Sequence, residues 1–109
     1  MTQSSDETFR IDRFTVPEAA REEFLAQVAD THDILRTLPG FVRDAILEKP
    51  GAPGELIVVT IAEWDSTEAI GNARKVIQDH RAETGFEPQE FMAKLGITPE
   101  LASYQRLDV

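Results

Sequence analysis

Apolar and polar side chains alternate over residues 9–16, where the sequence reads FRIDRFTV. A repeat of two residues is typical of a strand, and it places Asp12 on the same face as Phe14. Residues 18–38 instead carry apolar side chains at helical spacing, with acidic residues in the early turns. The proline–glycine pair that ends at Gly40 then predicts the end of this helix.

Two further strands, residues 41–49 and 55–64, are predicted on either side of the turn sequence PGAPG. The second of them, ELIVVTIAEW, is apolar on both faces, which is typical of a strand in the centre of a sheet. Asp65 and Glu68 then form a capping-box pattern. We therefore expect Asp65 to cap a second helix that runs to about residue 83.

The C-terminal part predicts a short helix over residues 88–96, because this segment begins with proline and ends with glycine. Residues 98–100 predict a turn or a further helical turn, and residues 103–109 alternate as a fourth strand. The order β-α-β-β-α-(α)-β is that of a ferredoxin-like α+β fold with a four-stranded antiparallel sheet. We expect a flexible tail over residues 1–8 and a single domain over residues 9–109.

The apolar second face of residues 55–64 needs a cover that this chain does not supply. Two main helices can cover only one face of a four-stranded sheet. A second copy, packed sheet to sheet, would cover the other face, so the pattern predicts a homodimer. The alternative is a modestly apolar face that stays in contact with water, as antiparallel sheets allow.

Composition excludes several classes of protein. The 11 basic and 20 acidic residues give a net charge of −9, so nucleic acids and anionic membranes would be repelled. The sequence has no cysteine and only 2 histidines, which argues against disulfides, thiolate chemistry and a bound metal. No apolar stretch approaches the ~20 residues of a membrane span, and no secretion signal is evident, so we expect a cytoplasmic protein.

His80 and Asp12 are the candidate catalytic residues. Helical spacing puts His80 on the same face as Ala73 and Ile77, where a partly buried imidazole could remove a proton from an acidic C–H or phenol. The alternative is a histidine that binds the last carbonyls of its helix. A buried Asp12 could take part in acid–base chemistry. The alternatives are a position at the sheet edge in contact with water, or an ion pair with a neighbouring arginine.

Other side chains could shape a pocket between the sheet and the helices. Trp64 offers a flat apolar wall for an aromatic ligand, but it equally suits the core at the end of its strand. His32 could face the same cavity or be a packing histidine, and Phe91 could belong to an apolar lid or to the core. Tyr104 could point into the pocket or into the dimer seam.

Four short motifs are spread over residues 9–109: FRIDRFTV, LPGF, ELIVVTIAEW followed directly by DSTEAI, and the C-terminal YQRL. Together they resemble the antibiotic biosynthesis monooxygenase family. The resemblance implies a dimeric α+β barrel, with cofactor-free oxygenation of aromatic polyketides in some members and haem degradation in others. The polyketide-oxygenating branch binds its substrate with tryptophan, tyrosine, arginine and asparagine residues. Trp64 corresponds to its tryptophan, and Arg81 and Tyr104 are candidates of the right residue type without a matched position, whereas no asparagine occurs near the end of residues 55–64.

The haem-degrading branch matches less well. Its strand asparagine corresponds to Asp12, and its helix tryptophan is absent, with Ala73 near that place. His80 lies late in the second helix, but closer to Trp64 than in that branch. The leading hypothesis is therefore a monooxygenase that needs no cofactor or metal and acts on a small planar aromatic substrate of polyketide or quinone type. The alternatives are a non-catalytic dimeric barrel that binds a small ligand or serves in a stress response, and then haem binding or degradation.

Overall fold

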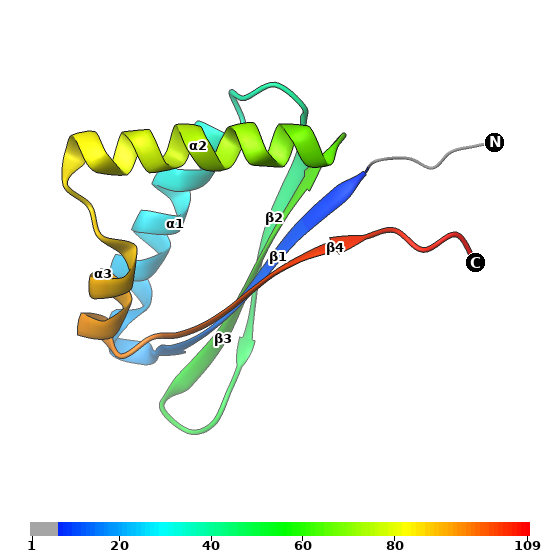
Figure 1. The fold of residues 1–109 in the computed structure, drawn as a ribbon. Helices are drawn as coiled ribbons and strands as arrows, with labels where there is room; N and C mark the ends of the chain where they lie inside the picture. Colours follow the sequence, from blue (N-terminus) through cyan, green and yellow to red (C-terminus); the bar gives the residue numbers. More distant parts are fainter. Residues whose placement is uncertain (1–6) are drawn as a thin grey trace.

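The sheet and helices follow the ferredoxin-like order in the computed structural model, which describes residues 7–109 (Figure 1). Of the tail expected over residues 1–8, all but Glu7 and Thr8 lies outside the described residues, and Thr8 already begins the first strand. The elements are β1 (Thr8–Pro17), a 3-10 turn (Glu18–Ala20), α1 (Arg21–Leu35), β2 (Phe41–Pro50), β3 (Glu55–Trp64), α2 (Thr67–Thr84), α3 (Pro88–Leu95) and β4 (Thr98–Gln105).

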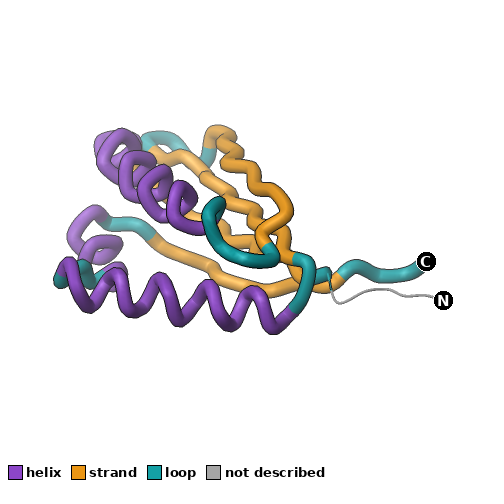
Figure 2. Tube along the Cα trace, turned by 90° about the horizontal axis from the view of Figure 1, so that it is seen from above, coloured by secondary structure: helices purple, strands orange, loops and turns teal. Residues whose placement is uncertain are grey.

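The four strands form one antiparallel sheet in the order β2-β3-β1-β4. The helices lie on one side of this sheet, and the C-terminal residues extend beyond its end (Figures 1 and 2). Because side chains alternate across a strand, every second residue of β1 and β3 faces the helices. The fold class expected from the sequence is therefore confirmed.

Three local expectations are wrong. The fourth strand spans Thr98–Gln105 rather than residues 103–109, and it can include Pro99 because a proline is tolerated in a strand at the edge of a sheet. The first helix is shorter than expected: residues 18–20 form a 3-10 turn and α1 ends at Leu35. Helix α2 is capped by Ser66 and not by Asp65, since the Ser66 hydroxyl accepts a hydrogen bond of 3.1 Å from the backbone N–H of Ala69.

Two apolar clusters join the helices to the sheet. One packs α1 and α3 against β1, with Phe14 and Phe24 at 4.9 Å between ring centroids. The other packs the start of α2 against β3, and Trp64 is its largest member. Each fully buried side chain of this kind contributes about 1.5–3 kcal/mol to stability.

The face of the sheet turned away from the helices is apolar along its centre, and it also carries charged side chains such as Arg13 and the Arg43–Glu63 ion pair. On β3 it presents Ile57, Val59 and Ile61, as the sequence predicts. Large side chains beside them are half exposed: Leu47 on β2 and Tyr104 on β4 are each 52% exposed. Among the described residues, no helix is both long and apolar enough to cross a membrane.

Candidate functional site

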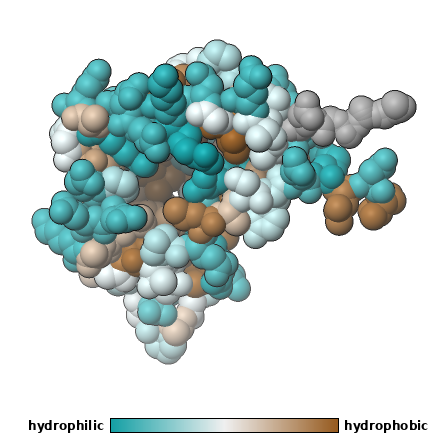
Figure 3. Space-filling view, in the orientation of Figure 1, coloured by the Kyte–Doolittle hydropathy of each residue, from teal (hydrophilic) through white to brown (hydrophobic). Residues whose placement is uncertain are grey.

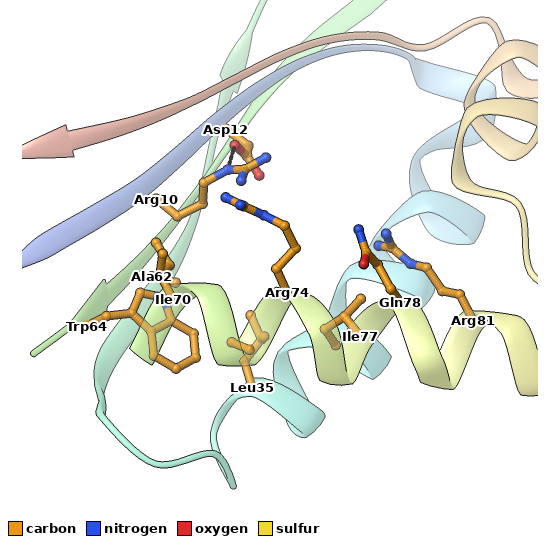
Figure 4. Close-up of a pocket in the computed structure, with 11 residues that line it drawn as sticks. Arg10, Asp12, Leu35, Ala62, Trp64, Ile70, Arg74, Ile77, Gln78 and Arg81 are labelled. Carbon is orange, nitrogen blue, oxygen red and sulfur yellow. Dashed lines mark hydrogen bonds and ion pairs between the residues drawn. The ribbon is translucent and has the colours of Figure 1, made fainter. Parts of the chain in front are cut away.

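An open cleft of about 310 Å³ lies between α2 and the helix-facing side of the sheet (Figure 4). In the space-filling view the surface is hollowed below α2 (Figure 3). The lining combines apolar groups with several cationic ones: Arg10, Asp12, Leu35, Ala62, Trp64, Ile70, Ala73, Arg74, Ile77, Gln78 and Arg81.

Strand and helix periodicity explain how these residues come together. On β1, Arg10 and Asp12 are two residues apart and so share the helix-facing side. Helix α2 contributes a polar row at Arg74, Gln78 and Arg81, whose spacing of four and three residues follows one face of a helix. In Figure 4 these three side chains extend from α2 towards the sheet.

Trp64 closes the apolar end of the cleft. It is 1% exposed and packs edge-on against Phe41, with 5.5 Å between ring centroids. The indole therefore belongs to the core around α2, while it also forms part of the cleft wall. The core role considered for Trp64 is thus observed, and its role as a wall for an aromatic ligand stays a prediction.

The charges in the cleft are mainly positive. The Arg10 guanidinium donates a hydrogen bond of 2.7 Å to Asp12, which is the arginine partner considered for this carboxylate. Arg74 and Arg81 form no ion pair with any residue of the described range 7–109. Burial lowers the pKa of Arg81, although an arginine remains charged at neutral pH. The cleft is thus a positive site on a chain whose net charge is −9.

A smaller apolar recess of about 100 Å³ adjoins the cleft beneath α1 and α3. Arg81 lines both spaces. Thr60 lines the recess, and its strand partner Asp12 lines the cleft, so the two spaces share the same face of the sheet. The other residues that surround the recess are mostly apolar: Phe14, Phe24, Gln27, Val28, Thr31, His32, Phe86, Pro88, Phe91 and Met92.

His32 is buried at the edge of this recess, with 6% of its surface exposed. Its Nδ1 lies 2.8 Å from a carboxylate oxygen of Asp44 on β2, and Arg36 binds the same oxygen at 3.0 Å. Burial raises the pKa of Asp44, but the hydrogen bonds from His32 and Arg36 outweigh burial and hold that pKa below its usual value. Asp44 is therefore a carboxylate at neutral pH.

The predicted site residues lie in four separate places, the last of which is the position of Tyr104 on the outer face of the sheet. Trp64, Asp12 and Arg81 meet in the cleft, and His32 and Phe91 line the adjoining recess. The expectation that His80 is buried is wrong, because His80 is exposed and lines a different recess, between α1 and α2. Spacing along α2 identifies the face towards α1, but it does not show how deeply that face is covered.

Tyr104 lies outside the cleft. It pairs with Phe9 across β1 and β4, and this pair faces away from the helices. Its position corresponds to the seam alternative rather than to a pocket wall. The sequence analysis overlooked Arg10, Arg74 and Asp44, although alternation with Asp12 and the seven-residue spacing from Arg81 could have indicated the first two.

A protein-family model described as antibiotic biosynthesis monooxygenase matches residues 9–85. The chain belongs to this family. No curated protein matches the chain. The resemblance seen in the sequence motifs is therefore confirmed at the level of the family.

Several solved structures are similar to this protein over almost the whole length of its chain. Crystal structures of SnoaB, a cofactor-independent oxygenase from Streptomyces nogalater, are 28% identical, cover 96% of this chain and 97% of theirs, and give TM-scores of 0.70 and 0.68. MhuD, crystallised with manganese protoporphyrin IX, is 22% identical with a TM-score of 0.65, covering 94% of this chain and 97% of its own. A dimeric ferredoxin-like protein from an uncultured marine organism is 12% identical with a TM-score of 0.70, covering 94% and 98%. The last two likenesses show the fold alone.

Proposed function

We propose that the protein is a cofactor-independent monooxygenase for a small planar aromatic substrate that carries an acidic group. The observation that carries this proposal is the cleft, which combines an aromatic wall at Trp64 with Arg74 and Arg81, neither of which is ion-paired within residues 7–109. Membership of the monooxygenase family and the similarity to SnoaB support the reaction class.

The cleft suits a substrate that becomes an anion. A planar ring system would lie against Trp64 and the apolar side chains Ile70 and Ile77. Loss of a proton from an acidic C–H or phenol leaves an enolate or phenolate, and the guanidinium groups of Arg74 and Arg81 would stabilise that negative charge. Asp12 would hold the Arg10 guanidinium over the cleft through their ion pair.

Dioxygen is the oxidant in this scheme. The substrate anion transfers an electron to dioxygen, and the oxygen species then recombines with the carbon. For an anthrone, the methylene carbon loses two hydrogens and gains one oxygen atom, and the second oxygen atom leaves with those hydrogens as water. The chain's own residues would bind the ring, stabilise the anion and move the proton.

The two other candidate functions make different demands. A non-catalytic barrel would bind the same aromatic anion in the cleft without consuming dioxygen. The cleft offers no histidine as a ligand for haem iron, because neither His32 nor His80 lines it. A titration with haem that leaves the Soret band unchanged would remove that candidate.

Oxygen uptake with a panel of anthrones and hydroquinones tests the proposal. Arg74→Gln and Arg81→Gln should each lower kcat/KM by about 10- to 100-fold, since a hydrogen bond to a charged group is worth about 1.5–3 kcal/mol. Arg21→Gln is the matched control, because Arg21 pairs with Glu48 and does not line the cleft. Binding of the panel without oxygen uptake would replace the monooxygenase with the non-catalytic barrel.

A further inference from the structure

The cleft contains no obvious base for the proton transfer that the proposed reaction requires. Asp12 is its one carboxylate among the described residues, and that group is already bound to Arg10. His80, the base expected from the sequence, lies in a separate recess. The chain has one other histidine, His32, in the apolar recess that adjoins the cleft.

The hydrogen bond to Asp44 determines which nitrogen of His32 carries the proton in the neutral ring. A carboxylate can only accept a hydrogen bond, so Nδ1 must donate its N–H across the 2.8 Å distance. The neutral imidazole then has no proton on Nε2. Nε2 is therefore the nitrogen with a lone pair that can accept a proton, and the His32 residue lines the recess.

We propose that His32 is the general base of the proposed monooxygenase and that Asp44 is the residue that positions it. The inference rests on the proposed function. Nε2 takes the proton from the acidic C–H or O–H of the substrate, so that bond breaks, an Nε2–H bond forms, and the electron pair stays on the substrate. His32 then returns the proton to the reduced oxygen that leaves as water.

The recess fits this task in size and polarity. Its volume of about 100 Å³ is smaller than the cavity of about 150 Å³ that holds a benzene ring, so the recess would admit one edge of an aromatic ring. Arg81 lines both spaces, so a ring that reaches from the cleft into the recess keeps its developing negative charge beside a guanidinium. Most of the side chains around the recess are apolar, and a less polar surrounding strengthens both interactions.

The charged groups around His32 come from three elements. Asp44 lies on β2, Arg36 follows its own helix α1, and Arg81 reaches the recess from α2. Within the described chain, the walls formed by β1, β3 and α3 are uncharged. A general base needs this arrangement, in which an imidazole lies between a buried carboxylate and an open space. The same hydrogen bond between His32 and Asp44 would also stabilise the packing of α1 against β2. The test therefore needs readouts that a structural tie would not change.

Nitrogen-15 NMR of histidine-labelled wild-type protein gives the first readout, and it does not depend on turnover. We expect the neutral His32 ring to carry its proton on Nδ1. Addition of a hydroxyanthraquinone, as an analogue of the product, should shift the Nε2 resonance of His32 and leave that of His80 in place. A proton on Nε2, or no response of His32 at saturating ligand, overturns the inference.

Oxygen uptake gives the second readout. His32→Gln should lower kcat by about 100-fold or more, with KM changed much less, and the acidic limb of the pH profile of kcat/KM should disappear. His32→Gly should regain part of its rate when imidazole is added, which a structural tie would not predict. Asp44→Asn should also lower kcat, whereas Asp33→Asn, which removes a different partner of Arg36, should not.

The possible outcomes distinguish a wrong assignment of the base from a wrong assignment of the reaction. An inactive wild type on the whole panel ends the proposed function, and the base assignment falls with it. An active wild type whose His32 variants keep their rate ends the base assignment alone. A loss of rate in His80→Gln, with His32→Gln unaffected, would restore His80 as the base.

Discussion

Asp44 is expected to contribute both to the stability of the fold and to the proposed proton transfer. Its carboxylate accepts hydrogen bonds from His32 and Arg36, and its side chain is 13% exposed. A folded-state pKa below the usual value means that the folded protein holds the charged form more strongly than the unfolded chain does. The resulting stability is present above the unfolded pKa of about 4 and is lost as the pH falls through the lower folded value.

Asp44→Asn should therefore cost stability at neutral pH and progressively less in acid. The free energy of unfolding, measured by urea titration at several pH values, is the test. Asp33→Asn is a matched control, because Asp33 also binds Arg36 but is 70% exposed. A difference between wild type and Asp44→Asn that stays constant from neutral pH to below pH ~4 would contradict the account.

The two histidines show how far single residues could be predicted. Both recur with apolar residues at helical spacing, and the sequence analysis preferred His80 to His32 as the base. The structure buries His32 and exposes His80. What separates them is the carboxylate of Asp44, which comes from β2 and has no relation to the periodicity of α1. Contacts between distant segments of this kind do not appear in a local pattern.

At the scale of elements, the N-terminus of α2 depends on one hydroxyl. Ser66 has an extended backbone and accepts the hydrogen bond from the N–H of Ala69, which would otherwise lack a partner within the helix. Ser66→Ala should lower the free energy of unfolding by about 1 kcal/mol. Asp65→Ala, at the position expected from the sequence, should cost clearly less. Equal losses, measured by chemical denaturation, would mean that both residues cap the helix.

The elements themselves were predicted better than their ends. Alternation and helical spacing correctly indicated four strands and three helices in the right order. The errors occur at Asp65, at Pro99 and around Leu35, where the outcome depends on a cap, a sheet edge or a turn. Pro99 reads as a break in the sequence, yet it lies in β4, because an edge strand tolerates a residue without an N–H.

The whole molecule presents a sheet face with an apolar centre that its own helices leave uncovered, and the Arg43–Glu63 ion pair lies on the same face. Ile57, Val59 and Ile61 run along the centre of this face, and Leu47 and Tyr104 stand half exposed on the flanking strands. Half-exposed large apolar side chains beside an apolar strand favour association. A second copy packed face to face would remove these side chains from water. A stable dimer of this kind buries about 800 Å² on each partner.

We therefore expect a homodimer at micromolar concentration, measured by light scattering coupled to gel filtration. Leu47→Glu should shift the protein towards the monomer, because it places a carboxylate in the seam, where it would lose its contact with water. Leu101→Glu is the matched control: its leucine is 51% exposed, against 52% for Leu47, but it lies on the helix-facing side of β4. A monomeric wild type, or equal effects of the two variants, would show that the outer face stays in water. If the dimer forms as expected, the cleft and its arginines remain on the opposite side of the sheet from the seam, so each subunit would carry its own site.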